Sequence, residues 1–156
     1  MNITRFNIRV YMLLYDETET RILLSDEIVQ GEYHTKFPGG GLEYGEGLLD
    51  CLHREAREEL GQDVEVLRQF YTSEIFQASK FVAEDQIICV YYQCCLPENS
   101  QGRRLPTFRV SDKKNDFVEM REREESFRWQ LTDTLREEDM SLPLDRVVVG
   151  LLKKEG

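Results

Sequence analysis

The sequence lacks any apolar run close to the roughly 18 residues that are needed to cross a bilayer. Its first ten residues contain no apolar stretch of signal-peptide length. We therefore expect no membrane partner and a cytoplasmic location. Internal repeats and low-complexity linkers are also lacking, so the 156 residues are expected to form a single domain over residues 1–156.

Cysteine is scarce and carries no metal-binding pattern. The four cysteines are Cys51, Cys89, Cys94 and Cys95, and none forms a CxxC pair or lies beside a histidine-rich tract. Structural zinc sites use such spacings, so a zinc site is not predicted. We interpret Cys89 and Cys95, which lie in an apolar run, as small core residues.

Positive charge is in deficit. Thirty acidic residues against 20 basic ones leave a formal net charge of -10. This balance argues against broad electrostatic adhesion to DNA or to an anionic membrane. It is still compatible with a phosphorylated small molecule, because carboxylates can hold cations that in turn bind phosphates. The 40% hydrophobic content is sufficient for a packed core and argues against wholesale disorder.

Hydrophobic periodicity predicts strands that alternate with two helices, which is typical of an α/β sandwich. Strands are expected over residues 4–15, 21–25, 64–77, 86–96 and 126–131, with helices over residues 47–60 and from Pro143 onward. The segment 27–35 is predicted to be loop, residues 37–41 to break regular structure, and residues 97–116 to form a long surface loop.

The first predicted helix carries a group of carboxylates. Glu55, Glu58 and Glu59 are spaced i, i+3 and i+4, which places them on one helix face. Packed carboxylates repel one another, so a hard divalent cation with oxygen ligands is a natural partner. A merely solvated face is the alternative, but the glycine-rich loop over residues 39–41 would bring backbone carbonyls into the same region.

Residues 40–62 resemble the Nudix box, G-x5-E-x7-R-E-U-x-E-E-x-G-U, in which U is a bulky aliphatic residue. Two positions depart from this pattern, because Ala56 is small and Gln62 is polar, and both concern packing rather than chemistry. Phe37, Pro38 and Gly39 also resemble the lead-in that is usual in the family. The fixed residues of the box are all present at their spacings, as Gly40, Glu46, Arg54, Glu55, Glu58, Glu59 and Gly61.

The resemblance implies a Nudix-type α/β/α sandwich with a mixed β-sheet, and an enzyme that hydrolyses the diphosphate bond of a nucleoside diphosphate derivative. By position, Glu58, Glu59 and the Gly39 carbonyl would bind Mg²⁺ or Mn²⁺. Glu55 would be a further metal ligand or would orient and deprotonate the attacking water. The same resemblance implies that Arg54 orients the glutamates and that Glu46 supports the loop through hydrogen bonds.

Members of the family often add an acidic ligand from outside the box, ahead of a late strand. Glu122, Glu124 and Glu125 are the candidates here, and Glu124 and Glu125 are preferred, with solvated surface as the alternative. Substrate-binding residues are not assigned. Strand aromatics such as Tyr91 could stack on a base but are more often core, and the basic residues of 103–114 could reach a phosphate or be solvated.

Two further functions compete with the hydrolase. One is a catalytically silent module that senses a nucleotide on the same fold, although the box is not degraded and too little chain follows for a winged helix. The other is an isomerase, whose extra catalytic positions are not identifiable. For a hydrolase, the substrate is left open between a nucleoside triphosphate, a nucleotide-sugar, a dinucleoside polyphosphate and capped RNA. A homodimer is likewise left open.

Overall fold

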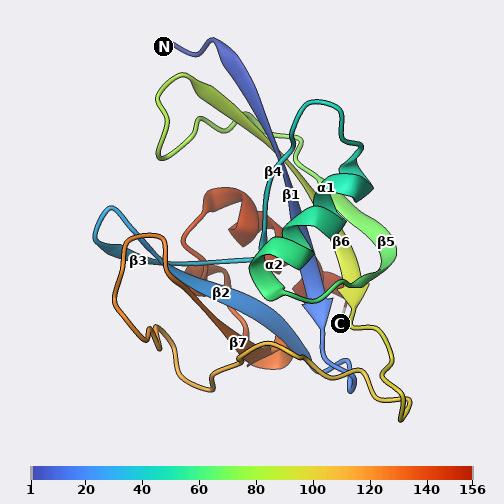
Figure 1. The fold of residues 1–156 in the computed structure, drawn as a ribbon. Coiled ribbons are helices and arrows are strands. Elements are labelled where there is room, and N and C mark those ends of the chain that lie inside the picture. Colours follow the sequence, from blue (N-terminus) through green and yellow to red (C-terminus); the bar gives the residue numbers. More distant parts are fainter. Residues whose placement is uncertain (1, 156) are drawn as a thin grey trace.

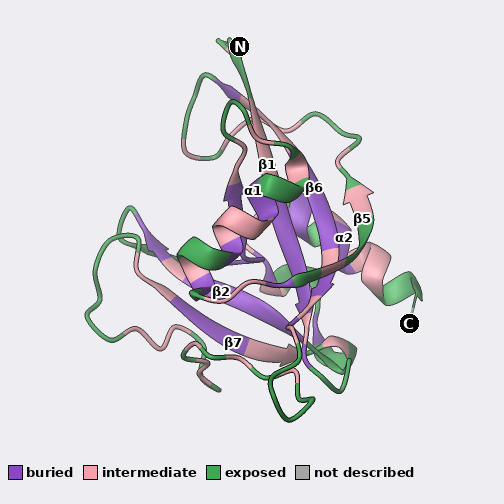
Figure 2. Ribbon diagram, turned by 45° about the vertical axis from the view of Figure 1, so that its right-hand side comes forward, coloured by how far each residue is buried: buried purple, intermediate pink, exposed green. Residues whose placement is uncertain are grey.

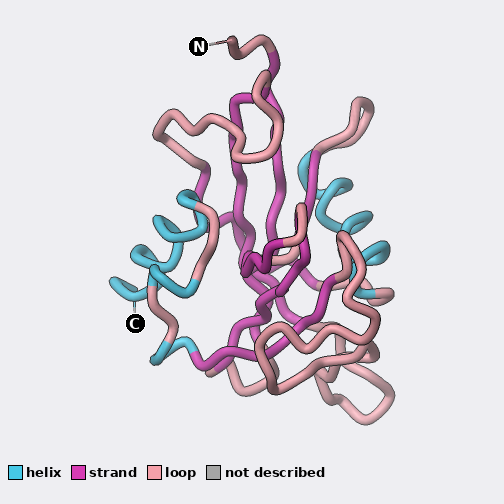
Figure 3. The backbone as a smooth tube through the Cα atoms, turned by 90° about the vertical axis from the view of Figure 1, so that its left-hand side faces the viewer, coloured by secondary structure: helices cyan, strands magenta, loops and turns pink. Residues whose placement is uncertain are grey.

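The computed structural model describes residues 2–155, which fold into one mixed β-sheet with helices on both sides. Figure 1 gives the arrangement, and in the view of Figure 3 the strands lie between helices on opposite sides. The strands are β1 (Arg5–Tyr15), β2 (Arg21–Val29), β3 (Glu32–Lys36), β4 (Gly39–Gly41), β5 (Glu65–Thr72), β6 (Asp85–Cys95) and β7 (Glu125–Leu131); the α-helices are α1 (Leu48–Glu55) and α2 (Pro143–Glu155).

The sheet follows the order β3-β2-β1-β6-β5, with β4 paired to β1 and β7 paired to β2. Strand β1 runs parallel to β6 over its full length, from the pair Arg5 and Asp85 to the pair Tyr15 and Cys95. The other pairings are antiparallel. The predicted α/β/α sandwich with a mixed sheet is therefore confirmed.

Strand β1 lies at the centre because both of its faces are buried. Val10, Met12 and Leu14 pack in the core cluster that includes residues of α1. Tyr11 and Leu13 point to the other face and pack in the cluster that includes residues of α2. Side chains alternate between the two faces of a strand, so an almost continuous apolar run supplies both cores at once. The buried central strands of Figure 2 correspond to this arrangement.

The prediction of a loop over residues 27–35 is wrong. Strand β2 continues to Val29, and β3 follows after a turn at Gln30 and Gly31. Both turn residues have positive φ, of 53° and 76°, as in the two-residue turns that match the twist of a hairpin. The sequence signal was weak because only the glycine is a usual residue for such a turn.

The expected helix over residues 47–60 begins one residue later, at Leu48, and changes character at its end. Residues Ala56–Leu60 form a π-helical turn, a feature that is frequent at functional sites. Gly61 ends it in the left-handed region, with φ 68°, as expected of a C-cap glycine. The helix buries Cys51 and Leu52 against the sheet and leaves Leu49 exposed.

The remaining predictions hold in outline. The strand predicted over residues 64–77 ends at Thr72, and residues 39–41 form the short strand β4 rather than irregular structure. The long segment 97–116 contains no helix or strand, β7 begins at Glu125, and α2 begins at Pro143. No helix in the described part of the chain is long and apolar enough to span a membrane.

Candidate functional site

Strand β4 and helix α1 meet at two glycines. Gly39 has φ +150°, and a Cβ there would overlap the Val10 carbonyl of the neighbouring strand. A Cβ on Gly40 would overlap the Glu55 carboxylate. Only glycine allows both close approaches. The sequence therefore brings the backbone of β4 directly against an acidic side chain of α1.

Arg54 connects the loop after β4 to the carboxylates of the helix. Its guanidinium donates to both carboxylate oxygens of Glu46, at 2.5 and 2.9 Å, and to the Gly41 carbonyl at 3.0 Å. It also donates to Glu55 at 3.0 Å and to Glu58 at 3.2 Å. This planar, forked donor set holds three acidic groups in fixed positions. The arrangement fits the orienting role that the resemblance implies for Arg54.

Glu46 forms hydrogen bonds within the loop that precedes α1. One of its carboxylate oxygens accepts the Glu43 N–H at 2.9 Å, and the Arg54 hydrogen bonds lower the pKa of Glu46 to about 2. Glu46 is therefore ionised at any physiological pH, and its charge keeps Arg54 turned toward the loop.

Glu59 is a partly buried carboxylate of the box helix. It accepts the Gly39 N–H at 3.3 Å. Burial raises the pKa of Glu59 far above the ordinary range, against the lowering effect of Lys36, and the nearby charges of Glu125 and Glu55 raise it further. Glu58 differs, since its side chain is 59% exposed. Glu55 and Glu59 are thus partly buried, while Glu58 between them faces solvent.

The three acidic candidates ahead of β7 lie in different environments. Glu125 accepts the Ser25 hydroxyl at 2.5 Å and lies 3.6 Å from the Lys36 ammonium, and its charge acts on Glu59. Glu124 instead accepts three backbone N–H groups of the loop over residues 118–121. Glu122 accepts the N–H groups of the turn between β2 and β3. The fold therefore brings Glu125 to the box helix and uses the other two to order loops.

Within residues 2–155, no three acidic, histidine or cysteine side chains converge closely enough to enclose a metal ion. The donor chemistry nevertheless fits a hard divalent cation, because every candidate side chain offers carboxylate oxygens. Burial, and to a smaller extent the charges of Glu125 and Glu55, disfavour the ionised form of Glu59. A divalent cation would favour that ionised form. Glu55, Glu58, Glu59 and Glu125, with the Gly39 carbonyl, are the groups that could hold it.

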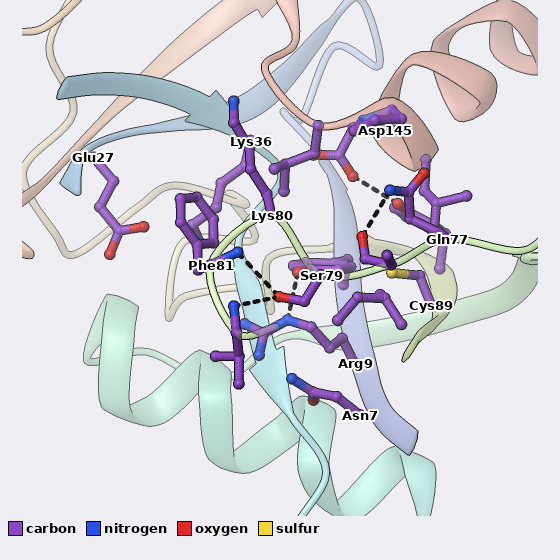
Figure 4. A pocket seen from close by; sticks show the side chains of 18 of the residues that line it. Asn7, Arg9, Glu27, Lys36, Gln77, Ser79, Lys80, Phe81, Cys89 and Asp145 are labelled. Atoms are coloured by element: carbon purple, nitrogen blue, oxygen red, sulfur yellow. Dashed lines mark hydrogen bonds between the residues drawn. The ribbon is translucent and has the colours of Figure 1, made fainter. Parts of the chain in front are cut away.

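A cavity of about 180 Å³ lies on the opposite side of β1 from α1 (Figure 4). Strands β1 and β6, the loop over residues 77–82 and the start of α2 form its walls. Asp145 is its most unusual group. One Asp145 oxygen accepts the Tyr91 hydroxyl at 2.6 Å, while the other is buried with no hydrogen-bond partner among the residues that the structure describes.

Several cations also line this cavity, including Arg9, Lys36 and Arg123. Sequence reasoning missed Lys36 and Asp145, because neither belongs to a motif and each becomes a cavity residue only through tertiary packing.

Tyr91, considered both as core and as a base platform, is fully buried and lines the cavity. Two of the basic loop residues lie elsewhere, since Arg103 and Arg104 pair with Glu17 and Glu65.

Comparison with known proteins identifies the class to which this fold and carboxylate site belong. A model of the NUDIX domain matches residues 5–146. No curated protein matches the sequence significantly. The chain belongs to the Nudix family.

Solved structures share the fold at low sequence identity. A MutT protein of the Nudix hydrolase family from methicillin resistant Staphylococcus aureus 252 is 22% identical, with TM-score 0.62 over 99% of this chain and 100% of that one. A NUDIX hydrolase from Nitrosomonas europaea is 18% identical, with TM-score 0.61 over 97% and 90%. A MutT protein from Methanosarcina mazei Go1 is 20% identical, with TM-score 0.58 over 97% and 96%.

Proposed function

We propose that this protein is a pyrophosphohydrolase that uses Mg²⁺ or Mn²⁺ to cleave a diphosphate bond in a nucleoside triphosphate or another nucleoside diphosphate derivative. One observation carries the proposal. Arg54 holds the box glutamates Glu46, Glu55 and Glu58 in one hydrogen-bonded network. The partly buried Glu59 bonds the glycine strand and is close enough to Glu125 to feel its charge.

The proposed metal ligands are Glu55, Glu58, Glu59 and Glu125, with the Gly39 carbonyl. Glu124 is the weaker candidate, because its carboxylate is already occupied by backbone N–H groups. A bound divalent cation would neutralise phosphate oxygens and lower the pKa of a coordinated water. The protein itself would contribute position and charge rather than a covalent nucleophile.

The catalytic residues in this proposal are Glu55, Glu58 and Glu59, and Arg54 positions them. Glu55 has its carboxylate held between Gly40 and Arg54, with 13% of its side chain exposed. That confinement suits a group that orients the attacking water and accepts its proton. Arg54 keeps Glu55 and Glu58 in place without needing to touch substrate.

The organic part of the substrate would enter the cavity beside β1. A dry cavity of about 150 Å³ is known to accommodate a benzene-sized ring, so the cavity of about 180 Å³ suits a base-sized group. The free oxygen of Asp145 would accept a hydrogen bond from an N–H group of that ring, because a buried acceptor without a partner is costly. This supports a nucleobase with an amino or ring N–H group facing Asp145.

The test is turnover of nucleoside triphosphates, nucleotide-sugars and dinucleoside polyphosphates with Mg²⁺ or Mn²⁺, read as released phosphate or pyrophosphate. We expect metal-dependent turnover that falls at least a hundredfold in Glu58→Gln and Glu59→Gln. The matched control is Glu138→Gln. Glu138 is about as exposed as Glu58 but pairs with Arg136, away from the box. This variant should keep wild-type rates.

The competing function is a silent nucleotide-sensing module. Binding of a nucleotide by calorimetry, without turnover of any compound in the panel by the wild type, would support that function and contradict the hydrolase. Turnover that is equal in wild type and Glu59→Gln would contradict the assigned site while leaving a hydrolytic activity.

A further inference from the structure

Lys36 is a charged side chain in an enclosed place. It lies at the end of β3, its side chain is 10% exposed, and it lines the cavity beside β1. Buried ammonium groups are costly unless they are paired. The partner is Glu125, whose carboxylate lies 3.6 Å from the Lys36 nitrogen. No feature of the Nudix box accounts for this residue.

The charges around Lys36 belong to the proposed metal site. Burial alone would lower the pKa of Lys36, but Glu125 and Glu59, with smaller effects of Tyr11 and Glu27, raise it above its ordinary value. The geometry gives the same assignment, because the ammonium lies 3.6 Å from the Glu125 carboxylate and is a paired charge in this enclosed place. Lys36 in turn is the main group that opposes the rise in the pKa of Glu59.

The contact between Lys36 and Glu125 is loose. The separation of 3.6 Å exceeds a charge-assisted hydrogen bond of about 2.7–2.9 Å. The same Glu125 oxygen already accepts the Ser25 hydroxyl at 2.5 Å. Lys36 thus supplies charge to the carboxylates without occupying their lone pairs, and its flexible stem borders open space on the cavity side.

We propose that Lys36 is an internal counter-ion that competes with the divalent cation for the Glu59–Glu125 pair and thereby weakens metal binding. The inference rests on the proposed function in one respect, namely that Glu59 and Glu125 are metal ligands. In the metal-free protein the ammonium offsets part of the acidic charge. When a divalent cation binds, the two positive centres repel each other, and part of the binding free energy is lost to that repulsion.

The experiment is calorimetric titration of the whole protein with Mn²⁺ and with Mg²⁺ at pH 7.5, without substrate. Lys36→Met should bind the metal at least about tenfold more tightly than wild type. A divalent and a monovalent cation a few ångströms apart repel each other by more than the free energy that corresponds to a tenfold change in affinity. Lys36→Arg keeps the charge and should stay within about threefold of wild type. Lys80→Met is the matched control, since Lys80 lines the same cavity but is exposed.

Equal metal affinity in wild type and Lys36→Met, or weaker binding in the variant, would overturn the counter-ion role while leaving the hydrolase proposal standing. Absence of metal binding in all four proteins would overturn both. If Lys36→Met does not fold by circular dichroism, side-chain ammonium NMR of the wild type decides. Added Mg²⁺ must then move the Lys36 signal more than the Lys80 signal, and the reverse order would overturn the proposal.

Discussion

At the scale of single residues, Asp145 is a buried acid at the start of a helix. It is 1% exposed and lies in the first turn of α2, where the positive end of the helix dipole favours a negative charge. Burial nevertheless dominates and raises the pKa of Asp145 to about 6, against the lowering effects of the Tyr91 hydrogen bond and Lys36. Such a group costs stability whenever it is ionised in the folded protein.

The pH dependence of stability should reveal this cost. Below about pH 3 the carboxyl is protonated in both the folded and the unfolded chain, so it has no effect. As pH rises to about 6, the unfolded chain loses its proton first and the fold becomes less stable, by up to about 3 kcal/mol. Asp145→Asn removes this titration. The substitution should therefore change the free energy of unfolding more favourably at pH 7.5 than at pH 4.

Urea denaturation of wild type and variant at the two pH values measures this difference. The control is Asp133→Asn, an exposed aspartate, which should change stability equally at both. A difference between Asp145→Asn and wild type that does not depend on pH would contradict an elevated pKa for Asp145.

At the scale of elements, the contact between β4 and α1 positions the carboxylates. Gly40 is buried against Glu55, whereas a Cβ on the next residue, Gly41, would lie at an ordinary 3.5 Å from the Arg9 guanidinium. Neither glycine has a positive φ, so the two differ in space and not in backbone conformation. They form a natural pair for testing whether close approach of strand and helix is required.

Gly40→Ala should displace the Glu55 carboxylate, which is the far end of a flexible side chain, so the free energy of unfolding should fall by only about 1 kcal/mol, the low end of overpacking costs. Turnover, expressed as kcat/KM, should fall at least tenfold. Gly41→Ala should stay close to wild type in both measurements. If thermal unfolding and kinetics show equal effects of the two substitutions, the contact is not what positions Glu55.

At the scale of the whole molecule, metal binding and folding should be linked. The proposed ligands come from β4 and the box helix, which are close in the chain, and from the start of β7, which is far from both. Only the folded sheet brings Glu125 to Glu59, so the unfolded chain has no comparable site. A ligand that binds only the folded state stabilises it in proportion to the logarithm of its concentration.

Mg²⁺ or Mn²⁺ at a hundred times its dissociation constant should stabilise the fold by about 2.7 kcal/mol, which corresponds to roughly 5–10 °C in Tm for a chain of this size. Differential scanning calorimetry measures the shift. Glu59→Gln should remove most of it, and Glu138→Gln should keep it. A metal-induced shift of the same size in Glu59→Gln would show that the ion binds elsewhere.

The sequence by itself determined the parts of the site that are close along the chain. Helical spacing places Glu55, Glu58 and Glu59 together, and the spacing from Gly40 to Gly61 identifies the family motif. The continuous apolar run of β6 likewise indicated a central strand. These features depend on local geometry, which repeats with a known period.

The tertiary structure alone decided which distant groups join that helix. Three glutamates lie within four residues at the start of β7, and only strand register directs Glu125 to Lys36 and Glu59 while the other two order loops. The cavity with Asp145 arises because α2 packs against one face of β1. Pairing and packing between remote segments carry no local period. The family resemblance therefore narrowed the outside ligand to Glu124 and Glu125 without deciding between them, and no sequence pattern pointed to Lys36 or Asp145.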